Sequence, residues 1–251
     1  MTLSLKNISK SFGDRKILHN ISLDMEEGEF VSLLGPSGSG KSTLFSLIGG
    51  LLVPDEGDIW LDGQVITNKS GHISYMPQQP SLFPWRTVLD NTLLGQELSG
   101  KKDLTEAKRL LEKANLGDMI GAYPHQLSGG MRQRVAFIRA LLSPQPIMLL
   151  DEPFSALDAF TRLDMQKWLL ETWEEYEQSI LFITHDIEEA LFLSDKIVIL
   201  SSHPAEIKEI VHVPFGRPRD ESLLLSYDFL DWKKELTEKI QNKPQVKSKI
   251  S

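Results

Sequence analysis

The sequence predicts an α/β fold with a mainly parallel sheet, an antiparallel β subdomain at the N-terminus and an inserted α-helical lobe. Three observations support this prediction. Short apolar runs of strand length alternate with helical stretches in the later part of the chain, as in parallel sheets covered by helices on both faces. The first 25 residues instead alternate apolar and polar side chains between turns. Residues 90–142, more polar and helical, separate the two patterns and predict the lobe.

The first elements follow from turns and apolar runs. A Gly13-Asp14 turn separates two alternating stretches, and Glu27-Gly28 precedes a mostly apolar run that is short enough for a buried strand. Leucine and isoleucine then recur at helical spacing until Gly49-Gly50. In chain order we expect strands at 3–8 and 17–23, a buried strand at 30–34, a helix beginning near 41 and a hairpin at 58–65.

The inserted lobe is most polar from Asp90 to Pro124, where Leu104, Ala107, Leu110, Leu111 and Ala114 share one helical face. The elements expected after it are a helix at 128–142, a strand at 147–150, a helix at 163–177, a strand at 180–184, a helix at 187–193 and a strand at 197–200. Beyond residue 220 one amphipathic helix carries Leu223, Leu230, Leu236 and Ile240, and a flexible tail begins near Asn242. The predicted domains are therefore 1–220 and a C-terminal helix and tail, 221–251.

Composition limits the classes of function. The 251 residues have 41% hydrophobic content and a formal net charge of −8, which argues against a nucleic-acid binder that relies on Lys and Arg. The chain has no cysteine, so disulfides and cysteine-based metal sites are excluded. We find neither a secretory signal in the first ten residues nor about 18 consecutive apolar residues, so a role at a membrane is expected to need a partner.

A glycine-rich loop after the apolar strand matches the phosphate-binding pattern GxxxxGK[ST], and a helix follows it directly. Glycines let backbone N–H groups surround phosphates, and the helix points its positive end at the same anion. Lys41 is expected to reach the β- and γ-phosphates, and Ser42 to offer its hydroxyl to Mg²⁺. The predicted nucleotide-binding residues here are Gly35, Pro36, Ser37, Gly38, Ser39, Gly40, Lys41, Ser42 and Thr43.

Two carboxylates follow the apolar run that begins at Ile147. Asp151 is expected to hold Mg²⁺ through its water shell. Glu152, one residue later, is the predicted general base that polarises an attacking water. Alone, this pattern also fits an acidic turn after a core strand, and its pairing with the phosphate loop favours the catalytic interpretation. Together the two motifs predict a P-loop NTPase core.

A second anion-binding pattern is present at Leu127–Arg134, where Ser128, Gly129 and Gly130 open a helix. A helix start offers a hydroxyl, free N–H groups and a positive end, although one complete phosphate loop already exists in the chain. This stretch resembles the signature of ABC ATPases, in which it faces the ATP held by the other protomer of a head-to-tail dimer. Leu98-Ser99-Gly100 lacks the second glycine and the basic helix, and we interpret it as a loop.

The resemblance implies roles for further residues. Phe12 would stack on adenine, and Gln78 would contact Mg²⁺ and water, with neighbouring Gln79 as the alternative. Asp158 ends a Ser-Ala-Leu-Asp loop that would cross the dimer interface. His185 would be the switch histidine at the γ-phosphate. The resemblance thus implies ATP and Mg²⁺ as cofactors, catalysis by Glu152, His185 and Gln78, and metal binding by Ser42, Gln78 and Asp151.

In this family the helical lobe contacts a membrane permease. The resemblance therefore implies a second ATPase subunit (a homodimer), permease subunits, an indirect substrate-binding protein, no nucleic acid, and a peripheral position on the cytoplasmic face of the inner membrane. The segments 82–91 and 216–220 resemble importers of nitrate, sulfonate and taurine. The alternatives are a soluble ABC ATPase that acts on DNA or ribosomes and a P-loop kinase or GTPase, which the stretch from Ser128 to Arg134 disfavours.

Overall fold

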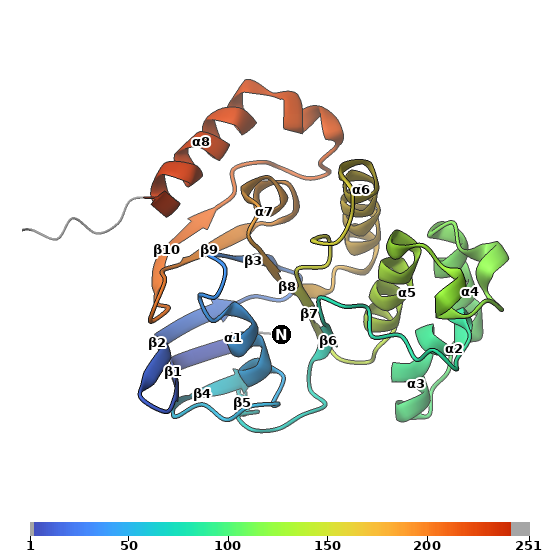
Figure 1. The fold of residues 1–251 in the computed structure, drawn as a ribbon, viewed down its shortest axis with the longest axis horizontal. Helices are drawn as coiled ribbons and strands as arrows, with labels where there is room; N and C mark the ends of the chain where they lie inside the picture. Colours follow the sequence, from blue (N-terminus) through green and yellow to red (C-terminus); the bar gives the residue numbers. More distant parts are fainter. Residues whose placement is uncertain (1–2, 242–251) are drawn as a thin grey trace, which may run out of the picture.

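The computed structural model describes residues 3–241, which form two sheets and the helices around them (Figure 1). The strands are β1 (Leu3–Phe12), β2 (Arg15–Met25), β3 (Phe30–Leu34), β4 (Glu56–Leu61), β5 (Gln64–Val65), β6 (Ser74–Met76), β7 (Ile147–Asp151), β8 (Ser179–Thr184), β9 (Lys196–Leu200) and β10 (Ile207–His212). The helices are α1 (Lys41–Ile48), α2 (Val88–Thr92), α3 (Leu94–Ser99), α4 (Leu104–Lys113), α5 (Gly129–Leu141), α6 (Ala159–Tyr176), α7 (Ile187–Leu193) and α8 (Tyr227–Gln241). Short 3-10 helices are η1 (Gly117–Met119), η2 (Pro124–Gln126) and η3 (Glu221–Leu225).

The larger sheet has six strands in the order β10-β9-β3-β8-β7-β6, and the pairs from β9 to β6 are parallel. Every residue of β3, β7, β8 and β9 is buried, which explains their nearly continuous apolar sequences. Because these strands are parallel, their carboxyl ends meet at one edge. The phosphate loop, Glu152 and His185 follow β3, β7 and β8, so the topology brings all three to that edge.

Apolar residues fill both sides of the six-stranded sheet. Along β3, Val31 and Leu33 join the core shared with α1 and the four-stranded sheet. Phe30 and Leu34 join the core shared with α5, α6, α7 and α8. The four-stranded sheet, in the order β2-β1-β4-β5, is antiparallel. The predicted α/β architecture is therefore confirmed, including the antiparallel N-terminal subdomain.

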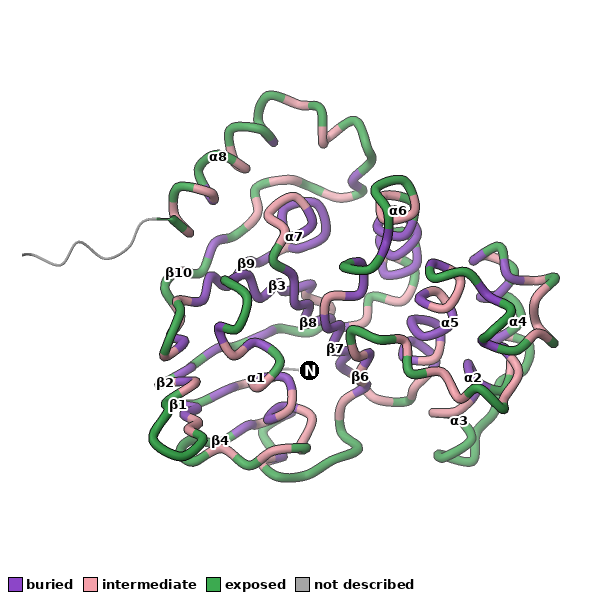
Figure 2. Tube along the Cα trace, in the orientation of Figure 1, coloured by how far each residue is buried: buried purple, intermediate pink, exposed green. Residues whose placement is uncertain are grey.

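The helical lobe, α2 to α4, lies at one side of the molecule against α5 (Figures 1 and 2). Ala107, Leu110, Leu111 and Ala114 are buried, as the helical spacing predicts. Leu104 was expected on the same face but is 51% exposed, because it is the first residue of α4 and lies beyond the contact with the core. The lobe thus rests on one stripe of α4 and on the buried face of α5.

Several boundaries differ from the prediction. Helix α6 begins at Ala159 rather than Leu163, because the Asp158 carboxylate accepts a hydrogen bond of 3.1 Å from the Thr161 N–H and caps the helix. Strand β6, three residues long, was not predicted, nor was β10, which is a half-exposed edge strand. None of the helices within residues 3–241 combines the length and apolarity that crossing a bilayer requires.

The C-terminal segment is two helices and not the single helix predicted. Ser226 separates η3 from α8, and its hydroxyl accepts a hydrogen bond of 3.2 Å from the Phe229 N–H. Phe229 and Leu236 of α8 are fully buried in the core that contains α7, whereas Leu230 is 49% exposed. The predicted tail from Asn242 lies outside the described residues. The domain boundary at residue 220 stays a prediction.

Candidate active site

The phosphate loop joins β3 to α1 with two left-handed glycines. Gly38 has φ +74° and Gly40 has φ +94°, a region that favours glycine. At Gly40 a Cβ atom would also lie 2.8 Å from Ile17 Cγ2 and 2.9 Å from Leu18 Cδ2. The helix begins directly afterwards, and its first hydrogen bond runs from the Leu44 N–H to the Gly40 carbonyl at 2.9 Å. The turn therefore aims free N–H groups of α1 at the space outside the sheet edge.

Lys41 is folded back over this loop. Its Nζ donates hydrogen bonds of 2.8 Å to the Gly35 carbonyl and 2.9 Å to the Pro36 carbonyl, and the residue is only 5% exposed. Burial lowers the pKa of the Lys41 ammonium, while Glu152 and Asp151 oppose that shift. A buried ammonium beside an open cavity has strong affinity for an anion such as a phosphate.

Asp151 lies at the end of β7, facing the first turn of α1. Ser42 Oγ donates to Asp151 Oδ1 over 3.5 Å, and the Tyr75 hydroxyl donates to Oδ2 over 3.2 Å. Burial raises the pKa of the Asp151 carboxyl, and these two hydrogen bonds oppose the shift. Burial and the neighbouring Asp151 raise the pKa of Tyr75 to about 12. A hydroxyl and a carboxylate beside a phosphate site are the donor set that Mg²⁺ accepts, so these residues fit the ion.

Glu152 is held at the same edge in a left-handed conformation, with φ 45°. Its N–H donates to the Ile183 carbonyl of β8 over 3.0 Å, which fixes the turn after β7. Gln78 Nε2 lies 3.3 Å from Glu152 Oε2, and His185 Nδ1 lies 3.4 Å from the same oxygen. The Gln78 amide also donates to Ser155 Oγ over 3.2 Å. Two polar side chains from distant parts of the chain, Gln78 and His185, thus converge on one carboxylate.

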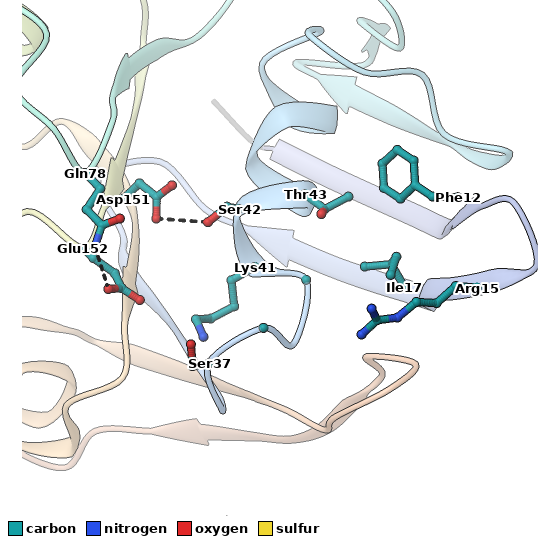
Figure 3. A pocket seen from close by; sticks show the side chains of 12 residues that line it. Phe12, Arg15, Ile17, Ser37, Lys41, Ser42, Thr43, Gln78, Asp151 and Glu152 are labelled. Carbon is teal, nitrogen blue, oxygen red and sulfur yellow. Dashed lines mark hydrogen bonds between the residues drawn. The ribbon is translucent and has the colours of Figure 1, made fainter.

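Glu152, Gln78, Asp151 and the phosphate loop border a cavity of about 490 Å³, within the usual size of a small-molecule site, whereas His185 does not line it (Figure 3). Phe12, 51% exposed, lies at the opposite end from Gln78 and Glu152. Gln79 is exposed and does not line the cavity, which favours Gln78 over its neighbour. The lining residues are Phe12, Arg15, Ile17, Ser37, Gly38, Gly40, Lys41, Ser42, Thr43, Gln78, Asp151 and Glu152.

Sequence reasoning missed Arg15 and Ile17, which line the cavity beside Phe12. Their position in the sequence could have indicated this. Gly13 and Asp14 turn the chain back beside Phe12, and Arg15 and Ile17, as alternate residues of the next strand, share one face. Tyr75, whose hydroxyl donates a hydrogen bond to Asp151, belongs to none of the sequence motifs. Gly35, Pro36 and Ser39 belong to the phosphate loop but do not border the cavity.

Four further predicted nucleotide-binding residues, outside the phosphate loop, do not line this cavity either: Ser128, Gly129, Gly130 and Asp158. Ser128 is exposed and caps α5, since its hydroxyl accepts a hydrogen bond of 3.2 Å from the Met131 N–H. Gly130 is packed closely enough that a Cβ atom would lie 2.7 Å from Thr161 Cγ2. Within one chain, the start of α5 therefore faces no part of the cavity that holds Lys41.

A buried carboxylate follows His185 by four residues. Glu189 is 6% exposed, and burial raises its pKa to about 7. Its carboxylate accepts hydrogen bonds of 2.5 Å from Thr184 Oγ1 and 3.3 Å from Gln166 Nε2. A raised carboxyl pKa means that the folded state binds this proton more tightly than the unfolded state. The resulting stability is complete below the unfolded pKa near 4.5 and is lost as the pH rises through about 7.

We therefore expect Glu189→Gln to stabilise the protein at pH 8 and to change it little at pH 5, where the wild-type carboxyl is already protonated. The shift from 4.5 to about 7 limits the gain to about 3 kcal/mol in the free energy of unfolding. Urea unfolding of both proteins at the two pH values measures the difference. The same gain at pH 5 and pH 8 would contradict the assignment of this titration to Glu189.

Comparisons with known proteins identify relatives of this chain. The sequence profile of the family described as "ABC transporter" matches residues 18–155. The chain is 42% identical over 226 residues to the aliphatic sulfonates import ATP-binding protein of Bacillus thuringiensis subsp. konkukian, covering 88% of this chain and 90% of the relative. It is 38% identical over 233 residues to the bicarbonate transport ATP-binding protein of Synechocystis sp., covering 89% and 83%. A solved dimeric ATP-binding cassette in a post-hydrolysis state with ADP and Pi aligns with TM-score 0.71 and 33% identity, covering 85% of this chain and 100% of that one.

Proposed function

This chain belongs to the ABC transporter family as an ATP-hydrolysing import subunit, and we propose that it works as a head-to-tail dimer. One observation carries the proposal: Ser128 opens α5 on an exposed surface, outside the cavity of its own protomer. A helix start with free N–H groups and an exposed hydroxyl, which accepts from Met131 and can still donate its own proton, suits an anion, and a second protomer supplies one. Each ATP would lie between the phosphate loop of one protomer and Ser128, Gly129 and Gly130 of the other. The dimeric form of the similar solved cassette supports this arrangement.

Within each protomer we propose that Phe12 stacks on the adenine, while the phosphate loop and Lys41 bind the phosphates. Both groups border the same cavity, which supports a single nucleotide spanning them. Ser42, Asp151 and Gln78 would hold Mg²⁺. When bound, Mg²⁺ neutralises charge on the phosphate oxygens and orients them for transfer.

For hydrolysis, we propose that Glu152 accepts a proton from the attacking water. Gln78 and His185 lie 3.3 Å and 3.4 Å from its Oε2 and so hold this carboxylate and the water near the γ-phosphate. A positioned general base contributes about 10²–10⁴-fold in rate. Asp158, which caps α6 beside Ser155, would contact the partner protomer.

The proposed import function also concerns the partners of the protein and the transported substrate. We infer that the protein lies peripherally on the cytoplasmic face of the membrane, bound through its helical lobe to permease subunits that a substrate-binding protein supplies. The relatives named for sulfonate and bicarbonate transport support a small solute such as a sulfonate, with nitrate or taurine as related candidates. Uptake assays with vesicles that carry the permease would separate these substrates, and transport of none of them would contradict the inference. Both relatives are named for transport, so an action on nucleic acid or ribosomes is not supported.

Mixing two inactive variants tests the shared site. We expect Lys41→Ala and Ser128→Arg each to abolish ATPase activity alone, because each destroys one half of both sites. In a mixed dimer, one site keeps both intact halves, since Lys41 and Ser128 come from different protomers. Half of the dimers in an equal mixture would then carry one active site of two, which gives about a quarter of the wild-type rate. A mixture as inactive as its components would contradict the shared site.

A further inference from the structure

A second, small cavity adjoins the active site. Its volume is about 30 Å³, enough for a single water molecule. Glu152 and His185 form part of its lining, and three charged residues of the following helices form another part: Arg162 of α6, Asp186 and Glu189. The proposed roles described so far do not use these three side chains.

Arg162 lies between the loop that precedes its own helix and the start of α7, more than twenty residues later in the chain. Its Nη2 donates a hydrogen bond of 3.0 Å to the Leu157 carbonyl, in the loop that precedes α6. Nη1 lies 4.0 Å from Asp186 Oδ2, and Nε lies 4.0 Å from Glu189 Oε1. Nε is buried and has no hydrogen-bond partner. Buried donors in proteins are almost always paired. This guanidinium therefore lacks hydrogen bonds that it would be expected to make, and the two carboxylates that could accept them lie just beyond hydrogen-bond distance.

Both carboxylates accept hydrogen bonds from residues within four positions of His185. Asp186 Oδ1 accepts hydrogen bonds from the N–H groups of Glu188 at 2.8 Å and Glu189 at 3.4 Å. Thr184 Oγ1 donates to Glu189 Oε2 over 2.5 Å and accepts from the Asp186 N–H at 3.0 Å. The residue before His185 and the residue after it are therefore both bonded within this cluster. A displacement of either carboxylate would move the histidine.

We propose that Arg162 is a positioning residue that couples the loop 155–158, at the dimer face, to the placement of His185. The proposal rests on the proposed function, since only a dimer gives that loop a partner to respond to. A shift of about 1 Å would bring the guanidinium nitrogens from 4.0 Å to hydrogen-bond distance of Asp186 and Glu189. The contact to the Leu157 carbonyl is the point at which a movement of the loop reaches Arg162. Closing the dimer would thus complete the cluster and fix His185 beside Glu152.

Steady-state kinetics of two variants test the coupling. We expect Arg162→Ala to lower kcat about ten- to hundredfold, as a misplaced catalytic group does, and to change KM for ATP less than about twofold. KM is spared because Arg162 does not line the cavity that takes the nucleotide. Arg162→Lys keeps the charge without the planar fork and should fall between. Lys167→Ala is the matched control, since Lys167 lies on the same helix and pairs with exposed Glu221 at 2.9 Å.

A measurement of ATP-driven dimerisation distinguishes a role of Arg162 in coupling from a role in only supporting the loop 155–158. In a Glu152→Gln background, addition of Arg162→Ala should leave ATP-driven dimerisation within about threefold, measured by sedimentation, because Arg162 transmits the closure and does not hold the partner. A wild-type kcat in Arg162→Ala would overturn the proposal. A parallel loss of kcat and dimerisation would also overturn it, since Arg162 would then only support the dimer face. Failure of the wild-type chain to dimerise with ATP would instead contradict the proposed function.

Discussion

Replacing Glu152 by Gln is expected to leave ATP binding intact and to slow hydrolysis about 10²–10⁴-fold, the usual contribution of a positioned general base. Gln has the same shape as Glu and can still contact Gln78 and His185, which lie 3.3 Å and 3.4 Å from the Glu152 carboxylate. It cannot accept the proton of the attacking water. The variant should therefore accumulate as an ATP-bound dimer. Single-turnover hydrolysis together with size-exclusion chromatography in ATP measures both effects.

Glu177→Gln is the matched control for this substitution. Glu177 also has a left-handed backbone, with φ 48°, and ends α6 without lining either cavity of the site. It should hydrolyse ATP at the wild-type rate. Turnover of Glu152→Gln within about fivefold of wild type would remove Glu152 from the role of general base, because a general base contributes far more than that.

Most of the candidate site could be proposed from the sequence because its parts follow strand ends. An apolar strand followed by a glycine loop or by two carboxylates is a local pattern, and parallel pairing then brings such patterns to one edge. The position of Gln78 shows what a local sequence pattern cannot predict, which is the direction of a side chain. The sequence alone allows either Gln78 or Gln79 as the glutamine of the site. Only the path of the chain after β6 aims the Gln78 amide at Glu152.

The cluster around Arg162 was not predictable for a different reason. Its members, from α6 and from the first turn of α7, form no sequence motif, and their contacts depend on how two helices pack. The same holds for Glu189, whose helical spacing gave no sign that its carboxylate is buried. Edge strand β10 was missed because half of its residues face solvent, so its sequence lacks the apolar run of the central strands. Contacts between elements, more than the elements themselves, limit what a single sequence reveals.

The second large effect concerns Lys41. We expect Lys41→Ala to weaken ATP binding about ten- to hundredfold, since a hydrogen bond to a charged group contributes about 1.5–3 kcal/mol. Hydrolysis should fall further, because the same ammonium would stabilise charge that develops on the transferred phosphoryl group. Titration with a fluorescent ATP analogue measures the affinity. Lys69→Ala is the control, since exposed Lys69 also donates to a backbone carbonyl, that of Val65 at 2.8 Å, but does not line the cavity.

Lys41→Arg then distinguishes charge from shape. If positive charge alone attracted the nucleotide, arginine would preserve the affinity. The carbonyls of Gly35 and Pro36, at 2.8 Å and 2.9 Å from Nζ, instead enclose a compact ammonium that is 5% exposed. A guanidinium is larger and planar and does not fit this cradle without displacing the loop. We therefore expect Lys41→Arg to bind ATP nearly as weakly as Lys41→Ala, and wild-type affinity in the arginine variant would show that the cradle does not select the ammonium.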